Sequence, residues 1–288
     1  MVGIVSAPAG KTSPKSVGLV ILVGGPQYRV GSHRQFVLLA WRLAGAGFPV
    51  LRFDYRGMGD SMGAPREFEA VQDDIAAAAN ALQRHCPAVT HIVLFGLCDA
   101  ASAALMYVDP AARLPDRRIV GLCLLNPWVR SEGTLARTHL KHHYAGRLRQ
   151  ADFWRKLFGG GGFNWRQSAR DLLDNLRITA LSTLAAVGNP VAGRNNARPL
   201  PFQQQMANAF QSFQGEVLLI LSGQDYTAKE FLDSAASGPH WRGALQRPGL
   251  RRLDLPAADH TFSTALWRAE VEQSVVTWMQ HLHRPTLE

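Results

Sequence analysis

The sequence predicts an α/β protein with a mostly parallel central sheet that is flanked by helices on both faces. Short apolar runs typical of β-strands alternate with helical runs along most of the chain. These runs are apolar at nearly every position, as in strands of a parallel sheet that is covered on both sides. Between residues 130 and 200 the alternation stops, and helical stretches occur without a convincing strand. We therefore predict a core of residues 1–129 and 201–288, with residues 130–200 inserted as a helical lid.

The predicted elements follow one another in the order that such a core requires. Strands are expected over residues 17–23, 49–55, 91–95, 119–125, 216–222 and 250–255. Helices are expected over residues 36–46, 69–84, 99–107, 227–236 and 263–281. Ligands of such sheets bind at the edge formed by the carboxyl ends of the strands, so we expect the lid above that edge.

Composition limits the class of protein. At 288 residues the chain can bury one large core, and its 18% of charged residues is ordinary for a soluble globular protein. Its apolar runs are too short to span a bilayer, and Met1–Ser16 lacks the apolar region of a secretory signal. Three cysteines without close pairing argue against a disulfide framework. We expect the protein to stay in the compartment where it is made.

The net charge of +9 is concentrated in the predicted lid. Residues 130–170 contain nine lysines and arginines but only two acids, Glu132 and Asp152. Such a field attracts anionic partners, although a solvated basic face is an equally open interpretation. No nucleic-acid-binding motif accompanies it, so no nucleic-acid partner is predicted. The nearby histidines lack zinc-finger spacing, and we predict no metal and no cofactor; they are His139, His142 and His143.

The strongest chemical signal is the segment Leu94-Phe95-Gly96-Leu97-Cys98-Asp99-Ala100-Ala101. An apolar strand runs through Gly-x-Cys-x-Ala into a helix of small residues, which is the pattern of a nucleophile elbow. Small residues two before and two after the nucleophile let strand and helix approach closely; Ala100 stands where glycine is usual. At a helix N-terminus the dipole and the free N–H groups favour a thiolate. The competing interpretation is an inert buried cysteine, which suits Cys86 and Cys123 well.

Two further segments complete a catalytic constellation. The strand over residues 216–222 is followed by Gly-x-Asp, which ends at Asp225, and the last strand is followed by His260 at the start of the final helix. Nucleophile, acid and base thus occur in the order Cys98, Asp225, His260, with the histidine as base and the acid holding its tautomer. Asp259 would have to fold back to reach the ring, and Asp254 lies inside its strand. We therefore predict Asp225 as the acid.

The oxyanion hole is predicted from the same layout. One donor is the backbone N–H of Asp99, the residue after the nucleophile, and the second comes from the loop after the first core strand. In that loop Pro26 has no N–H, so Gly25 is the predicted donor and Gln27 the fallback. A tight turn is the simpler interpretation of the same glycines.

A second glycine-rich loop, Asp54–Ser61, is predicted to be structural. Its glycines permit unusual dihedral angles, and Asp54 and Arg56 are expected to hold the turn. Ser61 is a weak alternative nucleophile because no elbow surrounds it.

With these residues considered, the chain resembles the α/β-hydrolase superfamily over nearly its whole length, and more narrowly the bacterial exosortase A system-associated hydrolase 1 family. The narrower resemblance depends on the segments at residues 23–36, 96–103 and 125–131. It implies an α/β-hydrolase fold and a cytoplasmic bacterial protein linked to exopolysaccharide and protein-sorting loci. A cysteine in the elbow is also similar to dienelactone hydrolases. One strand, within residues 2–7, is expected before residue 17, where this fold often has two.

Two functions of different classes are considered. The first is hydrolysis or transfer of an ester or thioester through a Cys98 acyl-enzyme, on an anionic carrier such as an acyl carrier protein, coenzyme A or an acidic glycan. Hydrophobic residues of the lid region would line its acyl pocket: Phe153, Trp154, Leu157, Phe158, Phe163 and Trp165. The second is a catalytically weak binding or scaffold protein whose basic segment docks on anionic membrane or polysaccharide, since Asp99 beside the nucleophile disfavours the thiolate.

Overall fold

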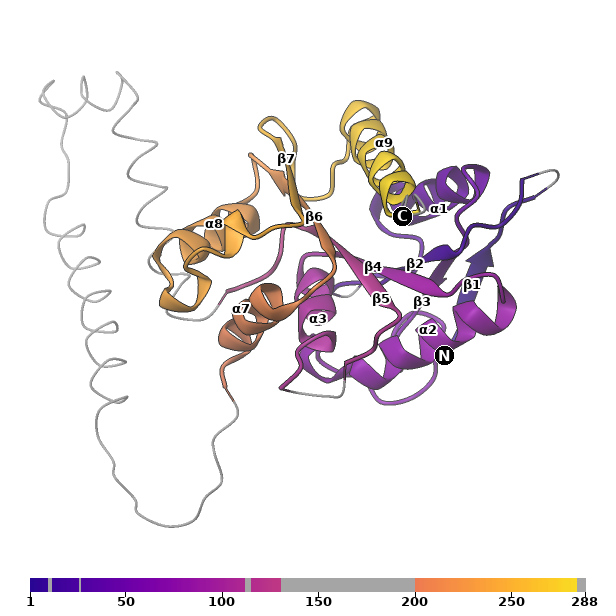
Figure 1. Ribbon diagram of the computed structural model, residues 1–288, viewed down its shortest axis with the longest axis horizontal. Coiled ribbons are helices and arrows are strands. Elements are labelled where there is room, and N and C mark those ends of the chain that lie inside the picture. Colours follow the sequence, from indigo (N-terminus) through magenta and orange to yellow (C-terminus); the bar gives the residue numbers. More distant parts are fainter. Residues whose placement is uncertain (10–11, 26, 112–114, 131–199, 284–288) are drawn as a thin grey trace, which may run out of the picture. The chain divides into compact units, whose positions relative to one another are not determined.

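The computed structural model describes residues 1–9, 12–25, 27–111, 115–130 and 200–283. Within them the chain forms one seven-stranded sheet with strand order β1-β3-β2-β4-β5-β6-β7 (Figure 1). The strands are β1 (Gly3–Ser6), β2 (Val17–Ile21), β3 (Val50–Phe53), β4 (His91–Leu97), β5 (Ile119–Leu125), β6 (Glu216–Ser222) and β7 (Leu250–Leu255). Only the first pairing, β1 with β3, is antiparallel; the other five pairings are parallel. The predicted mostly parallel sheet is confirmed.

Helices cover both faces of this sheet, as Figure 1 shows. The long helices are α1 (Gln35–Gly45), α2 (Gln72–His85), α3 (Asp99–Tyr107), α7 (Phe202–Ser212), α8 (Tyr226–Ser237) and α9 (Ala265–Leu282). Buried side chains of α1 and α9 pack on one face, and those of α2, α3, α7 and α8 pack on the other. Two apolar cores therefore enclose the sheet, which explains why its central strands are apolar at most positions.

One helix was missed by the sequence patterns. The predictions had no element between residue 200 and the strand β6, whereas α7 fills residues 202–212. Its Met206 and Phe210 are fully buried against the α3 side of the sheet, but three consecutive glutamines weaken its apolar pattern. Tertiary packing, more than local sequence, therefore stabilises α7.

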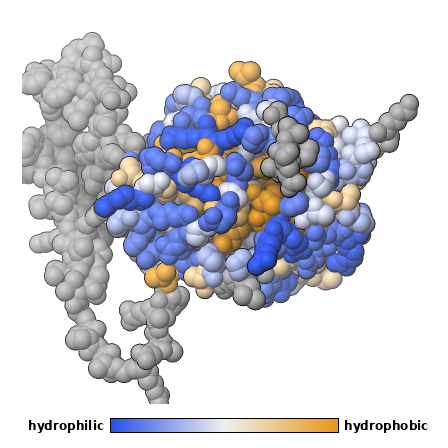
Figure 2. All heavy atoms as spheres, viewed as in Figure 1, coloured by the Kyte–Doolittle hydropathy of each residue, from blue (hydrophilic) through white to orange (hydrophobic). Residues whose placement is uncertain are grey.

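The described part of the chain has a largely hydrophilic surface. Figure 2 shows hydrophobic residues gathered near the middle of one face, surrounded by hydrophilic ones. A cavity of about 830 Å³ opens where the parallel strands begin, beside Val17, His91, Ile119 and Glu216. None of the described helices is long and apolar enough to cross a membrane.

The chain divides into two compact units. Residues 1–129 and 200–288 form the first, which contains the sheet, and residues 130–199 form the second. The lid prediction falls on the second unit. Because residues 131–199 lie outside the described residues, the lid, its histidines and its aromatic side chains remain predictions from the sequence.

Candidate active site

The residues predicted for catalysis follow the carboxyl ends of neighbouring strands. Cys98 comes directly after β4, Asp225 shortly after β6, and His260 after β7. Because β4 to β7 are parallel, their carboxyl ends lie at one edge of the sheet. The strand order reverses direction between β2 and β4, so the loop after β2 faces the elbow after β4. Such a reversal point is the usual ligand site of an open parallel sheet.

Cys98 occupies a strained turn between β4 and α3. Its φ and ψ are 63° and −126°, a conformation that costs a residue with a side chain on the order of 1–3 kcal/mol. The turn is held by the Cys98 N–H, which donates to Leu125 O at 2.9 Å, and by the Ser102 hydroxyl, which donates to Trp128 O at 2.7 Å. A Cβ atom on Gly96 would collide with the backbone of Ala100, so glycine is required there. Cys98 thus lies on a tight turn from strand to helix, and its role as the nucleophile stays a prediction.

His260 and Asp225 are in direct contact. Nδ1 of His260 lies 2.9 Å from Oδ2 of Asp225, and the Asp225 side chain is only 8% exposed. The same carboxylate accepts hydrogen bonds from the backbone N–H groups of Thr227 and Ala228, at 3.1 and 3.2 Å. These bonds fix the carboxylate at the start of α8, so it can fix the orientation of the imidazole in turn.

The environment of His260 stabilises its protonated form. Its hydrogen bond to Asp225, and next its interaction with Cys98, raise the pKa of His260 from 6.5 to about 10, against the opposing effect of burial. Cys98 therefore lies near the ring. Since Nδ1 faces Asp225, Nε2 is the nitrogen left for the thiol.

The two rival acids make other contacts. Asp259 accepts hydrogen bonds from the backbone N–H groups of Thr261 and Ser263, at 3.1 and 3.0 Å, and from the Ser263 hydroxyl. It shapes the turn that carries His260. Asp254 is exposed on β7 and pairs with Arg252 at 2.9 Å. Of the three carboxylates considered from the sequence, Asp225 is the one that contacts the imidazole.

Asn126 is a structural residue of the site that the sequence reasoning missed. It is fully buried at the end of β5 with φ of 44°. Its Nδ2 donates to Ser222 Oγ at 2.6 Å and to the carbonyl of His260 at 3.1 Å, while Oδ1 accepts from the Ser222 N–H at 2.9 Å. It thus ties the loop of His260 to the end of β6. The signal available in the sequence is a polar residue directly after a buried apolar strand.

The predicted oxyanion donors lie beside Cys98, but one of them has a partner already. The Gly25 N–H donates to Oδ2 of Asp99 at 2.7 Å. The side chain of Asp99, which the sequence prediction considered only for its backbone N–H and its charge, therefore faces the donor loop. Gln27, the fallback donor, is half-buried in the same loop.

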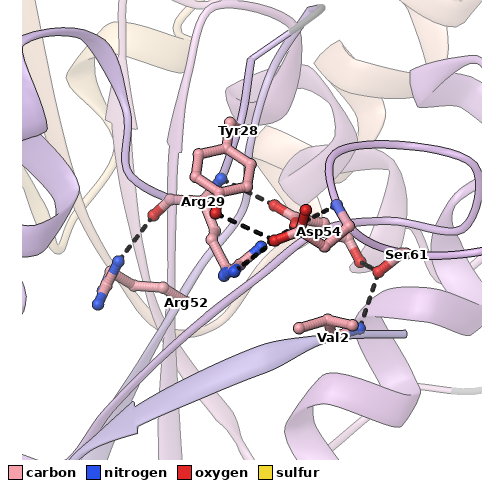
Figure 3. A network of polar contacts seen from close by, with 7 residues as sticks. Val2, Tyr28, Arg29, Arg52, Asp54 and Ser61 are labelled. Carbon is pink, nitrogen blue, oxygen red and sulfur yellow. Dashed lines mark hydrogen bonds and ion pairs between the residues drawn. The ribbon is translucent and has the colours of Figure 1, made fainter.

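The Asp54–Ser61 loop forms a second polar cluster, drawn in Figure 3. Asp54 is buried and pairs with the Arg29 guanidinium; its carboxylate also accepts the Arg29 N–H at 2.8 Å and the Asp60 N–H at 3.1 Å. Ser61 is 6% exposed; its hydroxyl donates to Asp54 O and accepts the Val2 N–H, both at 2.8 Å. These contacts support the structural interpretation of this loop, in which the Ser61 hydroxyl links Val2 to Asp54.

Arg56 holds the loop from its other side. Its backbone N–H donates to Asp74 Oδ2 at 2.9 Å, and its guanidinium pairs with the same carboxylate. Asp54 and Arg56, which we expected to hold the turn, thus act through separate partners.

The other predicted non-catalytic residues are accounted for in part. Cys86 and Cys123 are both buried, and burial raises the pKa of each thiol. Among the residues that the structure describes, no group of three or more His, Cys, Asp and Glu side chains could hold a metal ion. His139, His142 and His143 lie outside those residues.

Comparison with known proteins identifies the class. The sequence model of the alpha/beta hydrolase family matches residues 19–272, so the chain belongs to that family. No curated protein sequence matches the chain significantly.

Solved structures with esterase and lipase names share the fold. An esterase from Pyrococcus furiosus is 15% identical, with a TM-score of 0.58 over 93% of this chain and 83% of its own. A monoacylglycerol lipase from Paleococcus ferrophilus is 17% identical, with a TM-score of 0.57 over 98% of this chain and 99% of its own. A lipase in an open form is 18% identical, with a TM-score of 0.58 over 98% and 94%. At these identities the likeness shows the α/β-hydrolase fold, as predicted.

Proposed function

We propose that this protein hydrolyses esters or thioesters through an acyl-enzyme on Cys98, with His260 and Asp225 completing the catalytic triad. The observation that carries the proposal is the imidazole of His260, which lies 2.9 Å from Asp225 and is close enough to Cys98 for that residue to raise its pKa. A strained elbow presents the sulfur at a helix N-terminus, where the dipole favours an anion. The esterase and lipase names of structural relatives agree with acyl chemistry.

The proposed chemistry begins with a proton transfer. The thiol proton of Cys98 passes to Nε2 of His260, and the raised pKa of His260 means that the ring holds this proton at neutral pH. The sulfur attacks the carbonyl carbon of the acyl donor, and the electrons of the C=O π bond move to the oxygen. When that bond re-forms, the leaving oxygen or sulfur departs with its bonding electrons and takes the proton from His260.

The second half of the cycle releases the acid. A water molecule gives a proton to His260 while its oxygen attacks the thioester carbonyl. Collapse of this second intermediate breaks the carbon–sulfur bond, the acid leaves, and the thiolate of Cys98 again faces the protonated ring of His260. Asp225 remains a carboxylate throughout and stabilises the imidazolium. With a different nucleophile in place of water, the same acyl-enzyme would perform acyl transfer.

The narrower assignment is also a proposal. Residues 23–36, 96–103 and 125–131 resemble the exosortase A system-associated hydrolases, and this supports a cytoplasmic bacterial enzyme that serves exopolysaccharide or exosortase systems. The basic residues between 130 and 170 support an anionic acyl carrier, such as an acyl carrier protein or coenzyme A, and are compatible with peripheral contact with an anionic membrane.

Steady-state turnover tests the proposal. p-Nitrophenyl acyl esters and acyl-coenzyme A thioesters would be offered to the unsubstituted chain, to Cys98→Ala and to Cys86→Ala. Cys86 is a matched control because it is buried at the end of α2, away from the elbow. We expect turnover that Cys98→Ala abolishes and Cys86→Ala retains. Equal turnover by Cys98→Ala would overturn the proposal, and inactivity toward every donor would favour the binding or scaffold function.

A further inference from the structure

The side chain of Asp99 accepts a hydrogen bond from one of the two predicted oxyanion donors. An oxyanion hole works through N–H donors about 2.7–3.1 Å from the developing charge. The Gly25 N–H, in the loop after β2, has an oxygen at 2.7 Å already, and this oxygen is Oδ2 of Asp99. The carboxylate oxygen of Asp99 and the oxyanion of an acyl intermediate are both negatively charged oxygen atoms, so the same N–H donor suits either of them.

The surroundings of this carboxylate are shaped to hold it. A Cβ atom on Gly24 would collide with Oδ1 of Asp99, so the loop after β2 makes room for the carboxylate by lacking a side chain there. Burial raises the pKa of Asp99, while the backbone N–H groups of Gly25, Ala100 and Asp99 itself act against that rise. These groups include both predicted oxyanion donors. Within the described part of the chain, Oδ1 is buried without a hydrogen-bond partner.

We propose that the Asp99 carboxylate occupies the oxyanion site of the resting enzyme and must leave it before an acyl donor reacts at Cys98. The inference rests on the proposed acyl-enzyme function. An acyl carbonyl oxygen and the carboxylate cannot both accept the Gly25 N–H from the same position. Each acylation therefore has to break a charge-assisted hydrogen bond first, which slows acylation about ten- to a hundredfold.

Two reactions at the same sulfur separate this role from a change in thiol reactivity. Alkylation by iodoacetamide displaces iodide at a saturated carbon and forms no oxyanion. Acylation by p-nitrophenyl acetate forms an oxyanion and needs the donors. The ratio of the acylation rate to the alkylation rate at Cys98, measured by mass spectrometry of the Cys98 peptide, therefore reports on access to the oxyanion site.

The variants are Asp99→Ala and Asp99→Ser, whose side chains are too short to reach the Gly25 N–H. Asp254→Asn is the control, because it removes a carboxylate of the same type on β7 that pairs with Arg252. We expect the ratio to rise about ten- to a hundredfold in both Asp99 variants and to stay unchanged in the control. Using two variants, each checked by its thermal unfolding, keeps the test open if one of them fails to fold.

The outcomes separate the inference from the function on which it rests. If Cys98 of the unsubstituted chain is acylated and the ratio stays the same or falls in the folded Asp99 variants, the inference is overturned and the proposed function stands. That result, with a lower Tm, would show that Asp99 merely stabilises the start of α3. If Cys98 is alkylated but never acylated in any of the proteins, both fail. Acylation that appears only in the Asp99 variants would support the inference.

Discussion

Two polar clusters lie at the carboxyl edge of the sheet, and they differ in what their groups contact. In the first, which surrounds Asp54, the Ser61 hydroxyl is buried and engaged in two hydrogen bonds. In the second, Cys98 is partly exposed on a strained turn, and its neighbour His260 is bound to Asp225 through one ring nitrogen only. A nucleophilic side chain at this edge is therefore not enough to make a site. A strained turn and an oriented base distinguish the second cluster.

Replacing the general base, His260, should have the largest effect on turnover. Removal of a general acid–base group costs about 10²–10⁴ in rate, so we expect His260→Ala to lose that much turnover. His260→Ala should still fold, because the side chain is 34% exposed. Turnover of a p-nitrophenyl ester, together with the thermal unfolding temperature, measures both. Turnover that survives in His260→Ala would place the base elsewhere.

Breaking the Asp54 cluster should affect stability and leave the chemistry in place. Asp54→Ala leaves the buried guanidinium of Arg29 with one acidic partner, Asp60, instead of two. We expect a loss of about 3–5 kcal/mol in the free energy of unfolding, measured with urea. Turnover per folded molecule should stay close to that of the unsubstituted chain. A variant that is fully stable but inactive would move Asp54 from the scaffold into the catalytic site.

The acid of the triad can be separated from its rival by two matched substitutions. Asp225→Asn keeps the size of the side chain but removes the charge that holds the His260 imidazolium, so turnover should fall at least about a hundredfold. Asp254→Asn, on the neighbouring strand β7, should leave turnover unchanged because Asp254 pairs with Arg252. A larger loss in Asp254→Asn than in Asp225→Asn would reverse the assignment.

The pH dependence of stability gives a further test of the same base. The pKa of His260 is about 10 in the folded protein, against 6.5 for an ordinary histidine. The protonated ring therefore stabilises the fold fully below pH 6.5, and this contribution is lost as the pH rises from 6.5 to 10. The difference in Tm between the unsubstituted chain and His260→Ala should shrink across that interval. A Tm difference that grows with pH would contradict the raised pKa of His260.

Much of this site was predictable because it depends on the ends of strands. Cys98, Asp225 and His260 each follow a strand that the sequence predicts, and parallel strands bring such positions to one edge. Asn126 and the side chain of Asp99 were not predictable in their roles. Their contacts join segments that are far apart in the chain: 96 residues separate Asn126 from Ser222, and 74 separate Gly25 from Asp99. Those pairings depend on loop conformations that no periodic pattern encodes.

The same distinction between local pattern and long-range contact explains which strands and helices could be predicted. The strands β2 to β6 are largely apolar runs bounded by turn residues, and β7 alternates leucine with charged residues, so their existence followed from pattern alone. The helix α7 did not, because Met206 and Phe210 stand among glutamines and become a buried face only when the α3 side of the sheet is in place. A local pattern identifies an element when the element's own residues show a clear apolar pattern. It misses an element whose buried face is defined only by packing against its neighbours.

Trapping the acyl group on the chain tests the central claim most directly. The protein would be mixed with a p-nitrophenyl acyl ester, quenched in acid within the first turnover and digested for mass spectrometry. We expect one acyl group on the peptide that contains Cys98, absent from Cys98→Ala and strongly reduced in His260→Ala. An acyl group on Ser61 or on another residue, or turnover with no adduct on Cys98, would contradict it.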